Sequence, residues 1–258
     1  MSSLVVLEGL HALKHAVRFS ATVTEILTDD LDKALATADI VAPELRPLLE
    51  SRAEVVPAAE FRGRAVQPVP THVVAYAQRP CYSLAQAMPT AERPTILLDD
   101  PRNSKNLGAV VRVGAASGAA GILVNSQSDL FGPMAVRGAA GLQWALPCVA
   151  SPTLLGDLDD LLARPGRSGS SRAACEPPTA PVGPVTFVGL DAGGVPFDPG
   201  SFPGPTIFAF GSERTGLSDE VRTRCDQIVS LPMRPHVSSL NLATSVSAVM
   251  YLRIYAKQ

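Results

Sequence analysis

The chain has 258 residues, of which 46% are hydrophobic and 18% charged, and its formal net charge at pH 7 is −2. This composition excludes a wholly disordered chain and a globally basic nucleic-acid-binding protein. No apolar run reaches the roughly 18 residues needed to cross a bilayer. The four cysteines are widely spaced and form no CxxC pair, which predicts reduced thiols and no structural zinc site. We therefore expect a cytoplasmic protein that has no membrane partner and no bound metal.

Short apolar runs alternate with helical patterns in the first 80 residues. Apolar runs at 4–7, 23–27 and 73–77 indicate strands, patterns at 11–19 and 30–37 indicate helices, and 43–51 carries a further apolar pattern. This alternation predicts a small α/β domain over residues 1–80. Pro80, Pro89 and Pro94 mark a linker at residues 81–93.

Residues 94–258 repeat a strand–helix order. Strands are predicted at 95–98, 121–124, 146–149, 185–190, 206–210 and 228–231. Helices are predicted from Asn106 as N-cap to about 117, at 133–140 and 152–163, from Ser218 as N-cap to about 225, and at the C-terminus. Such an order predicts a mainly parallel sheet covered by helices. The segment 164–184 is dense in Pro, Gly, Ser and Ala and is predicted to be a flexible loop.

Two glycine-rich segments fail as nucleotide-binding motifs. Residues 114–121 lack the GxGxxG spacing and close a helix instead of opening one. Gly211 and Gly216 have the glycine interval of a P-loop, but Leu217 stands where the phosphate-binding lysine belongs. ATP and NAD chemistry, including phosphotransfer, is therefore disfavoured.

Polar residues and glycines gather in three segments that follow predicted strands. They carry the sequences NLGAVVR from Asn106, FGSERTGLS from Phe210, and LPM from Leu231 with SLN from Ser239. Open α/β sheets bind their ligands at the carboxyl ends of strands, so these segments are the candidate site.

In this order the three motifs resemble those of the SpoU/TrmH group of SPOUT methyltransferases, to which the thiostrepton-resistance methyltransferases are related. The resemblance spans residues 94–258, and the segment beginning at Leu7 is more loosely similar to the family's N-terminal RNA-binding domain. It implies a trefoil-knotted α/β domain, S-adenosylmethionine as cofactor, and methyl transfer to a ribose 2′-hydroxyl of tRNA or rRNA. It also implies a homodimer that acts on RNA and not on DNA.

Residue roles carry over where the motifs match. The implied catalytic residues are Arg112, Asn106, Glu213, Ser239 and Asn241. The implied cofactor-binding residues are Gly211, Leu231, Pro232, Met233 and Leu240. Arg112 is expected to act on the ribose hydroxyl, although a guanidinium that stays protonated at neutral pH is an awkward base. Gly211 is expected to leave room for the cofactor, since any Cβ would obstruct a close approach.

Residues 61–91 contain no Asp or Glu but include Arg62, Arg64 and Arg79, which we expect to bind RNA phosphates. The bland alternatives are a solvated basic face here, an ion-paired Arg112, and simple helix caps at Ser239 and Asn241. Glu213 could also merely favour a helix dipole, and Gly211 and Gly216 could serve only a tight turn. At the level of the whole protein, two rivals share the fold. One is methylation of a base, which Arg112 and the SLN triplet disfavour, and the other is a catalytically idle RNA-binding module.

Overall fold

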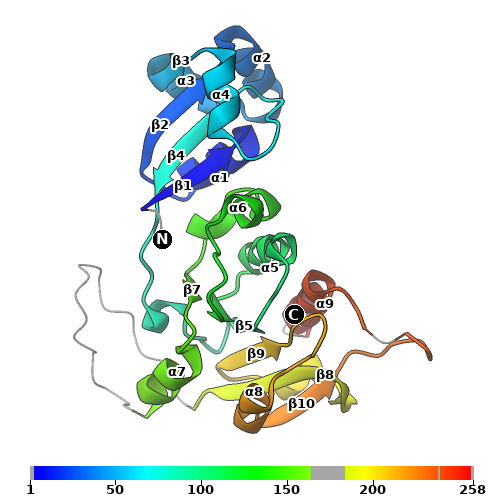
Figure 1. The fold of residues 1–258 in the computed structure, drawn as a ribbon. Coiled ribbons are helices and arrows are strands. Elements are labelled where there is room, and N and C mark those ends of the chain that lie inside the picture. Colours follow the sequence, from blue (N-terminus) through cyan, green and yellow to red (C-terminus); the bar gives the residue numbers. More distant parts are fainter. Residues whose placement is uncertain (1–2, 164–183, 238, 257–258) are drawn as a thin grey trace. The chain divides into compact units, whose positions relative to one another are not determined.

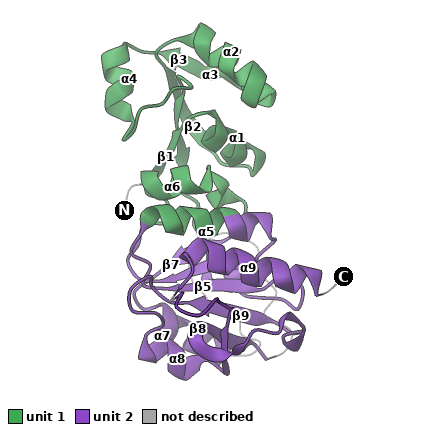
Figure 2. Ribbon diagram, turned by 90° about the vertical axis from the view of Figure 1, so that its right-hand side faces the viewer, with its two compact units in different colours: residues 1–81, 104–112, 129–145 green, residues 82–103, 113–128, 146–258 purple. Residues whose placement is uncertain are grey.

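The computed structural model describes residues 3–163, 184–237 and 239–256. The chain forms two compact units (Figure 2), of which unit 1 comprises 1–81, 104–112 and 129–145, and unit 2 comprises 82–103, 113–128 and 146–258. The loop predicted at 164–184 lies, except for Pro184, outside the described residues. No helix in the described ranges is long and apolar enough to cross a membrane.

Unit 1 is built on a four-stranded mixed sheet with the order β1-β4-β2-β3. Its strands are β1 (Leu4–Glu8), β2 (Val23–Thr28), β3 (Ala53–Val55) and β4 (Val74–Gln78). β4 runs antiparallel to β1 and β2, whereas β2 and β3 are parallel. Its complete helices are α1 (Leu10–Arg18), α2 (Leu31–Val41), η1 (Pro43–Leu45), α3 (Arg46–Arg52), α4 (Ala58–Arg64), α6 (Pro133–Ala139) and η3 (Leu142–Trp144).

The expected strands and helices of residues 1–80 are all present, but β3 and α4 were not predicted. β3 has only three residues, none of them fully buried, so it shows no alternation. α4 buries only Phe61 and contains Gly63, so it lacks an apolar stripe.

Unit 2 contains a six-stranded sheet with the order β10-β8-β9-β5-β6-β7, and every strand pair in it is parallel (Figure 1). The strands are β5 (Thr95–Asp99), β6 (Gly121–Asn125), β7 (Cys148–Ala150), β8 (Thr186–Pro196), β9 (Thr206–Phe210) and β10 (Gln227–Ser230). The helices are α5 (Ser104–Ala116), which the two units share, and η2 (Leu84–Ala87), α7 (Leu154–Leu162), η4 (Pro199–Ser201), α8 (Asp219–Arg224) and α9 (Leu242–Tyr255). The predicted α/β fold with a mainly parallel sheet is therefore confirmed.

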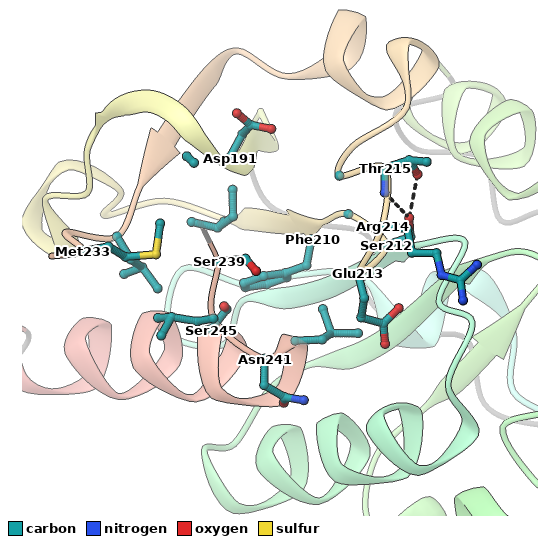
Figure 3. A pocket seen from close by; sticks show the side chains of 17 residues that line it. Asp191, Phe210, Ser212, Glu213, Arg214, Thr215, Met233, Ser239, Asn241 and Ser245 are labelled. Carbon is teal, nitrogen blue, oxygen red and sulfur yellow. Dashed lines mark hydrogen bonds between the residues drawn. The ribbon is translucent and has the colours of Figure 1, made fainter. Parts of the chain in front are cut away.

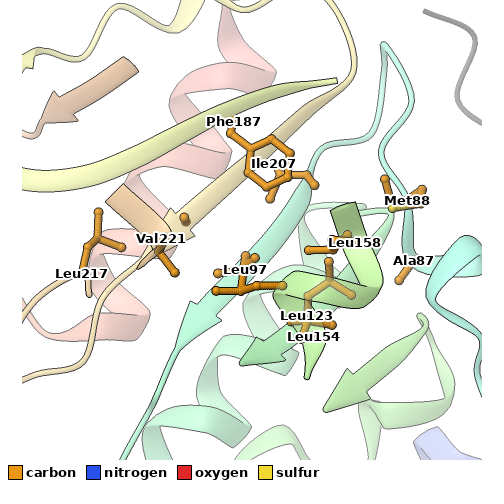
Figure 4. Close-up of a cluster of buried hydrophobic side chains, with 12 residues drawn as sticks. Ala87, Met88, Leu97, Leu123, Leu154, Leu158, Phe187, Ile207, Leu217 and Val221 are labelled. Carbon is orange, nitrogen blue, oxygen red and sulfur yellow. The ribbon is translucent and has the colours of Figure 1, made fainter. Parts of the chain in front are cut away.

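One face of this sheet is covered by α7 and α8. Leu97 of β5 and Ile207 of β9 share a buried cluster with Leu158 of α7 and Val221 of α8 (Figure 4). The central strands β5 and β9 are buried along their whole length, as expected for strands with neighbours on both sides. This packing fixes the strand ends from which the candidate loops emerge.

The helix termini confirm one predicted cap and correct another. The Ser218 hydroxyl accepts the N–H of Val221 at 3.3 Å, as predicted for the N-cap of α8. Asn106 is not an N-cap, because α5 already begins at Ser104 and places Asn106 in its first turn. Residues 100–103 separate β5 from α5, and Lys105 is a good helix former that lets the helix begin before Asn106.

Candidate active site

A cavity of about 670 Å³ lies at the carboxyl edge of the parallel sheet in unit 2 (Figure 3). Three segments line it: residues 190–192 of β8, residues 210–216 at the end of β9 and beyond, and residues of the stretch from Leu231 to Ser245. Leu190 and Phe210 form the last residue pair of β8 with β9, and the third segment begins directly after Ser230, the last paired residue of β10. The volume is typical of pockets that enclose a small molecule or cofactor.

The FGSERTGLS motif forms a closed turn. The Ser212 N–H donates to the Gly216 carbonyl at 3.0 Å, and the Gly216 N–H donates to the Ser212 carbonyl at 3.1 Å. The hydroxyls of Ser212 and Thr215 lie 2.7 Å apart, and Gly216 has a φ of +69° that favours glycine. The turn therefore presents Glu213 and Arg214 as exposed residues at the cavity.

Gly211 is required by this turn. A Cβ at Gly211 would lie 2.0 Å from the carbonyl carbon of Gly216 and 2.2 Å from the N atom of Leu217. Gly211 lines the cavity as expected, and the close backbone approach that the structure shows at this glycine is between two parts of the same loop. Its close approach to the cofactor stays a prediction.

The third motif leads into α9. The Asn241 side-chain oxygen accepts the N–H of Ala243 at 2.9 Å and that of Thr244 at 3.4 Å, so Asn241 is the N-cap of α9. Ser239 and Leu240 are exposed cavity residues before this cap, and Ser245 lies one turn after it. Figure 3 shows Ser239, Asn241 and Ser245 around the same space.

Leu231 and Met233 line the cavity from the segment that follows β10, and both are half-buried. Pro232 lies between them but is exposed and is not among the lining residues. Of the ten residues carried over from the motifs, seven therefore line one cavity: Gly211, Glu213, Leu231, Met233, Ser239, Leu240 and Asn241.

A third lining segment was missed by the sequence analysis. The pairing of β10 with β8 shifts from Gly189 to Val195 between adjacent residues of β10, so residues 190–194 of β8 form a bulge. Within it, Asp191 accepts the N–H of Gly193 at 2.9 Å and forms an ion pair with Arg222 of α8. The Gly193–Gly194 pair after an apolar run was the signal that could have indicated this bulge.

Asn106 and Arg112 lie on the part of α5 that belongs to unit 1, whereas every lining residue belongs to unit 2. Arg112 is exposed, while its helix neighbours Leu107, Val110 and Val111 are buried. No ion pair or hydrogen bond of the Arg112 side chain is recorded within the described part of the chain. The exposure of the Arg112 side chain therefore does not support the alternative in which Arg112 serves only a structural ion pair.

The three arginines expected to bind RNA differ in their surroundings. Arg62 and Arg64 are exposed on α4, where Arg64 pairs with Glu60 at 3.0 Å. The Arg79 guanidinium pairs with Asp129 at 2.7 Å and lies 4.7 Å from the centre of the Phe131 ring. Arg79 thus joins β4 to the 129–131 segment within unit 1, and its RNA contact stays a prediction.

Comparison with known proteins gives one family match. Residues 93–251 match the model of the SpoU rRNA Methylase family. The 23S rRNA (uridine(2479)-2'-O)-methyltransferase of Streptomyces viridochromogenes is 33% identical over 187 residues, which cover 70% of this chain and 59% of that relative. An uncharacterized tRNA/rRNA methyltransferase of Mycobacterium marinum is 32% identical over 65% of this chain and 48% of its own length. The chain thus spans about half to three fifths of these relatives.

Solved structures share the architecture. The SpoU methyltransferase AviRb from Streptomyces viridochromogenes, in complex with AdoMet, superimposes with a TM-score of 0.77 at 25% identity, covering 99% of this chain and 91% of that one. An AdoMet-bound rRNA methyltransferase from Sinorhizobium meliloti gives a TM-score of 0.73 at 19% identity, covering 98% and 87%. The family match extends over all three motifs and the strands that carry them, and the chain therefore belongs to the SpoU rRNA methylase family.

Proposed function

We propose that this protein is an RNA 2′-O-methyltransferase, which transfers the methyl group of S-adenosylmethionine to a ribose 2′-hydroxyl of tRNA or rRNA. The observation that carries the proposal is the single cavity on which the second and third family motifs converge. The named activity of the Streptomyces viridochromogenes relative, a 2′-O-methyltransferase of 23S rRNA, supports the same reaction class.

The cavity residues fit S-adenosylmethionine. Apolar side chains such as Leu190, Phe210 and Leu242 suit an adenine ring, whereas the carboxylate of Glu213 suits a cationic sulfonium. We expect the backbone of lining residues such as Gly211, Leu231 and Leu240 to supply hydrogen-bonding groups for the polar parts of the cofactor. When bound, this cofactor supplies an electrophilic methyl group.

The polar residues of the motifs would orient the reacting groups. Because the Asn241 oxygen caps α9, any contribution of Asn241 to a ligand comes from its side-chain NH₂ group. Glu213 and Ser239 would hold the cofactor or the target nucleotide by hydrogen bonds. Arg112 would bind the phosphate beside the target ribose and polarise the 2′-hydroxyl, a role that a permanently charged guanidinium performs well.

We further propose that the small domain over residues 1–80 binds RNA. Within the described ranges the exposed Arg62 side chain forms no ion pair or hydrogen bond, and Arg64, two residues later, is exposed despite its pair with Glu60. An exposed ion pair of this kind contributes little to stability, so a phosphate can displace the carboxylate. Arg62 and Arg64 are thus better placed than Arg79 for phosphate contacts.

We also propose a cytoplasmic homodimer whose catalytic domain has the trefoil knot of its family. The support for the homodimer is helix α9, which is apolar on both sides. Val246, Val249 and Met250 are buried, whereas Leu252 is 43% and Tyr255 69% exposed. A helix that is apolar all round is normally covered on all sides, and a second copy of the chain is the proposed cover. Light scattering during gel filtration should give twice the mass of 27.0 kDa.

Mapping of 2′-O-methyl groups in RNA from cells with and without the gene tests the proposed reaction. We expect one or a few sites in tRNA or rRNA to lose the 2′-O-methyl group when the gene is deleted and to regain it on complementation. Unchanged 2′-O-methylation throughout both RNA classes would contradict the proposal. Loss of a base methyl group instead would favour the rival reaction.

A further inference from the structure

Asp99 places a buried carboxylate at the carboxyl end of β5. The residue is 4% exposed. One of its oxygens, Oδ2, accepts the N–H of Ser218 at 2.7 Å, and the other, Oδ1, accepts the side-chain NH₂ of Asn125 at 3.1 Å. Ser218 ends the FGSERTGLS motif and Asn125 ends β6, so one carboxylate joins three segments of unit 2.

Burial of this carboxylate is costly. Among the described residues no Lys, Arg or His side chain forms an ion pair with Asp99, so its two hydrogen bonds must offset the lost hydration. An apolar side chain at the end of an otherwise apolar strand would avoid this cost. The presence of an aspartate at position 99 therefore indicates that its hydrogen bonds with Ser218 and Asn125 are needed.

The contact with Ser218 fixes one end of the loop that lines the cavity. The other end leaves β9 at Phe210, which is held in the sheet ladder by pairing with Leu98 and Leu190. Between these ends the Ser212–Gly216 pair closes the turn. Without the Asp99 contact, the second half of the loop would be held by the Gly216 pairing and by the buried Leu217 side chain.

We propose that Asp99 is a positioning residue of the methyl-transfer site, which holds the loop of residues 211–218 in the shape that binds the cofactor. This inference rests on the proposed function. Asp99 itself is not among the lining residues, so it acts through Ser218. The contact is a charge-assisted hydrogen bond, which is about twice as strong as a neutral one.

The Asp99→Asn variant tests this role with almost no change in shape. Its amide oxygen can accept only one of the two donors, and its NH₂ group then faces the other donor. We expect the dissociation constant for S-adenosylhomocysteine, measured by calorimetry, to rise at least tenfold. We also expect amide hydrogen exchange of the 212–218 segment to accelerate at least tenfold in the protein without added ligand.

The double variant Asp99→Asn/Asn125→Asp provides a rescue. The amide at position 99 would then donate to the carboxylate at position 125 and still accept from Ser218, so each donor again meets an acceptor. We expect ligand affinity and hydrogen exchange to return to within about threefold of the wild type.

Glu8→Gln is the matched control for loss of a buried carboxylate. The Glu8 side chain is 3% exposed, accepts the N–H of Val66 at 2.6 Å and pairs with Arg137 at 3.4 Å, but it lies in unit 1. Glu8→Gln should lower the melting temperature without changing ligand affinity or the exchange of residues 212–218.

The inference is overturned if Asp99→Asn leaves both readouts unchanged. It is also overturned if Asp99→Asn lowers ligand affinity no more than Glu8→Gln does at an equal decrease in stability. A double variant that does not regain ligand affinity and slow hydrogen exchange would overturn it too. If wild-type protein binds no S-adenosylhomocysteine, the proposed function fails, but hydrogen exchange of the loop still decides the role of Asp99.

Discussion

Replacing Gly211 by alanine should damage the cavity by distorting its own wall. The added Cβ would lie 2.0 Å from the Gly216 carbonyl carbon and 2.2 Å from the Leu217 N atom, and both are backbone atoms. Ordinary van der Waals contact begins near 3.4 Å, so the loop must open by more than about 1 Å. The Ser212–Gly216 hydrogen bonds at 3.0 and 3.1 Å do not tolerate such a displacement.

The expected cost of Gly211→Ala is about 1–3 kcal/mol of stability, as for other forced overpacking. In a protein of this size that lowers the melting temperature by about 2–4 °C per kcal/mol. Because the loop lines the cavity, the dissociation constant for S-adenosylhomocysteine should rise at least tenfold, or about 1.4 kcal/mol.

Gly156→Ala is the matched control. Gly156 is exposed in α7, and a Cβ built there meets no atom within 4 Å. Alanine in a helix interior is favoured over glycine by about 0.5–1 kcal/mol, so this variant should be more stable and bind the ligand normally. Thermal unfolding and calorimetry on both variants give the comparison. Wild-type stability and affinity in Gly211→Ala would refute the proposed steric constraint.

Three other variants test the remaining roles. Arg112→Ala should lower methyl transfer by about 10²-fold or more while cofactor affinity changes only a few-fold. A variant that is insoluble or does not bind the cofactor would instead show that Arg112 has a structural role. The double charge reversal of Arg62 and Arg64 to Glu should weaken RNA binding and reduce the slope of log K against log salt by roughly 0.7–0.9 per lost phosphate contact. An unchanged slope and methylation rate would exclude both residues from RNA binding. Burial holds the pKa of His15 below its ordinary value of 6.5, against a backbone hydrogen bond with Ala140 that raises it. His15 therefore contributes stability that is fully present above about pH 6.5 and is lost as the pH falls below it. Urea unfolding from pH 5 to 7.5 should show a weaker pH dependence in His15→Asn, and an identical profile would contradict the assignment.

Local sequence patterns predicted the elements that bury a regular apolar face. β9 was predicted at its observed bounds, 206–210, because its apolar run is bounded by Pro205 and Gly211. The C-terminal helix was predicted from Leu242, Val246, Val249 and Met250, and all four are buried. The second and third motifs could be placed at one edge of the sheet because the strands before them were predicted correctly.

Long-range contacts account for what the sequence did not predict. Residues 129–145 belong to the same compact unit as residues 1–81, through contacts such as Arg79 with Asp129 and Glu8 with Arg137 at 3.4 Å. No local periodicity indicates such pairs. The bulge at 190–194 depends on how β10 pairs with β8, and the constraint on Gly211 depends on residues five and six positions later in the chain.

Methyl transfer in vitro tests the central claim most directly. RNA from cells that lack the gene is incubated with the protein and S-adenosylmethionine labelled in its methyl group, and the RNA is then digested to nucleosides and separated by chromatography. We predict label in 2′-O-methylated nucleosides with wild-type protein and a rate of labelling lower by about 10²-fold or more with Arg112→Ala. Label in a methylated base, or tight binding of RNA and cofactor without any transfer, would contradict the assignment of 2′-O-methyltransferase activity.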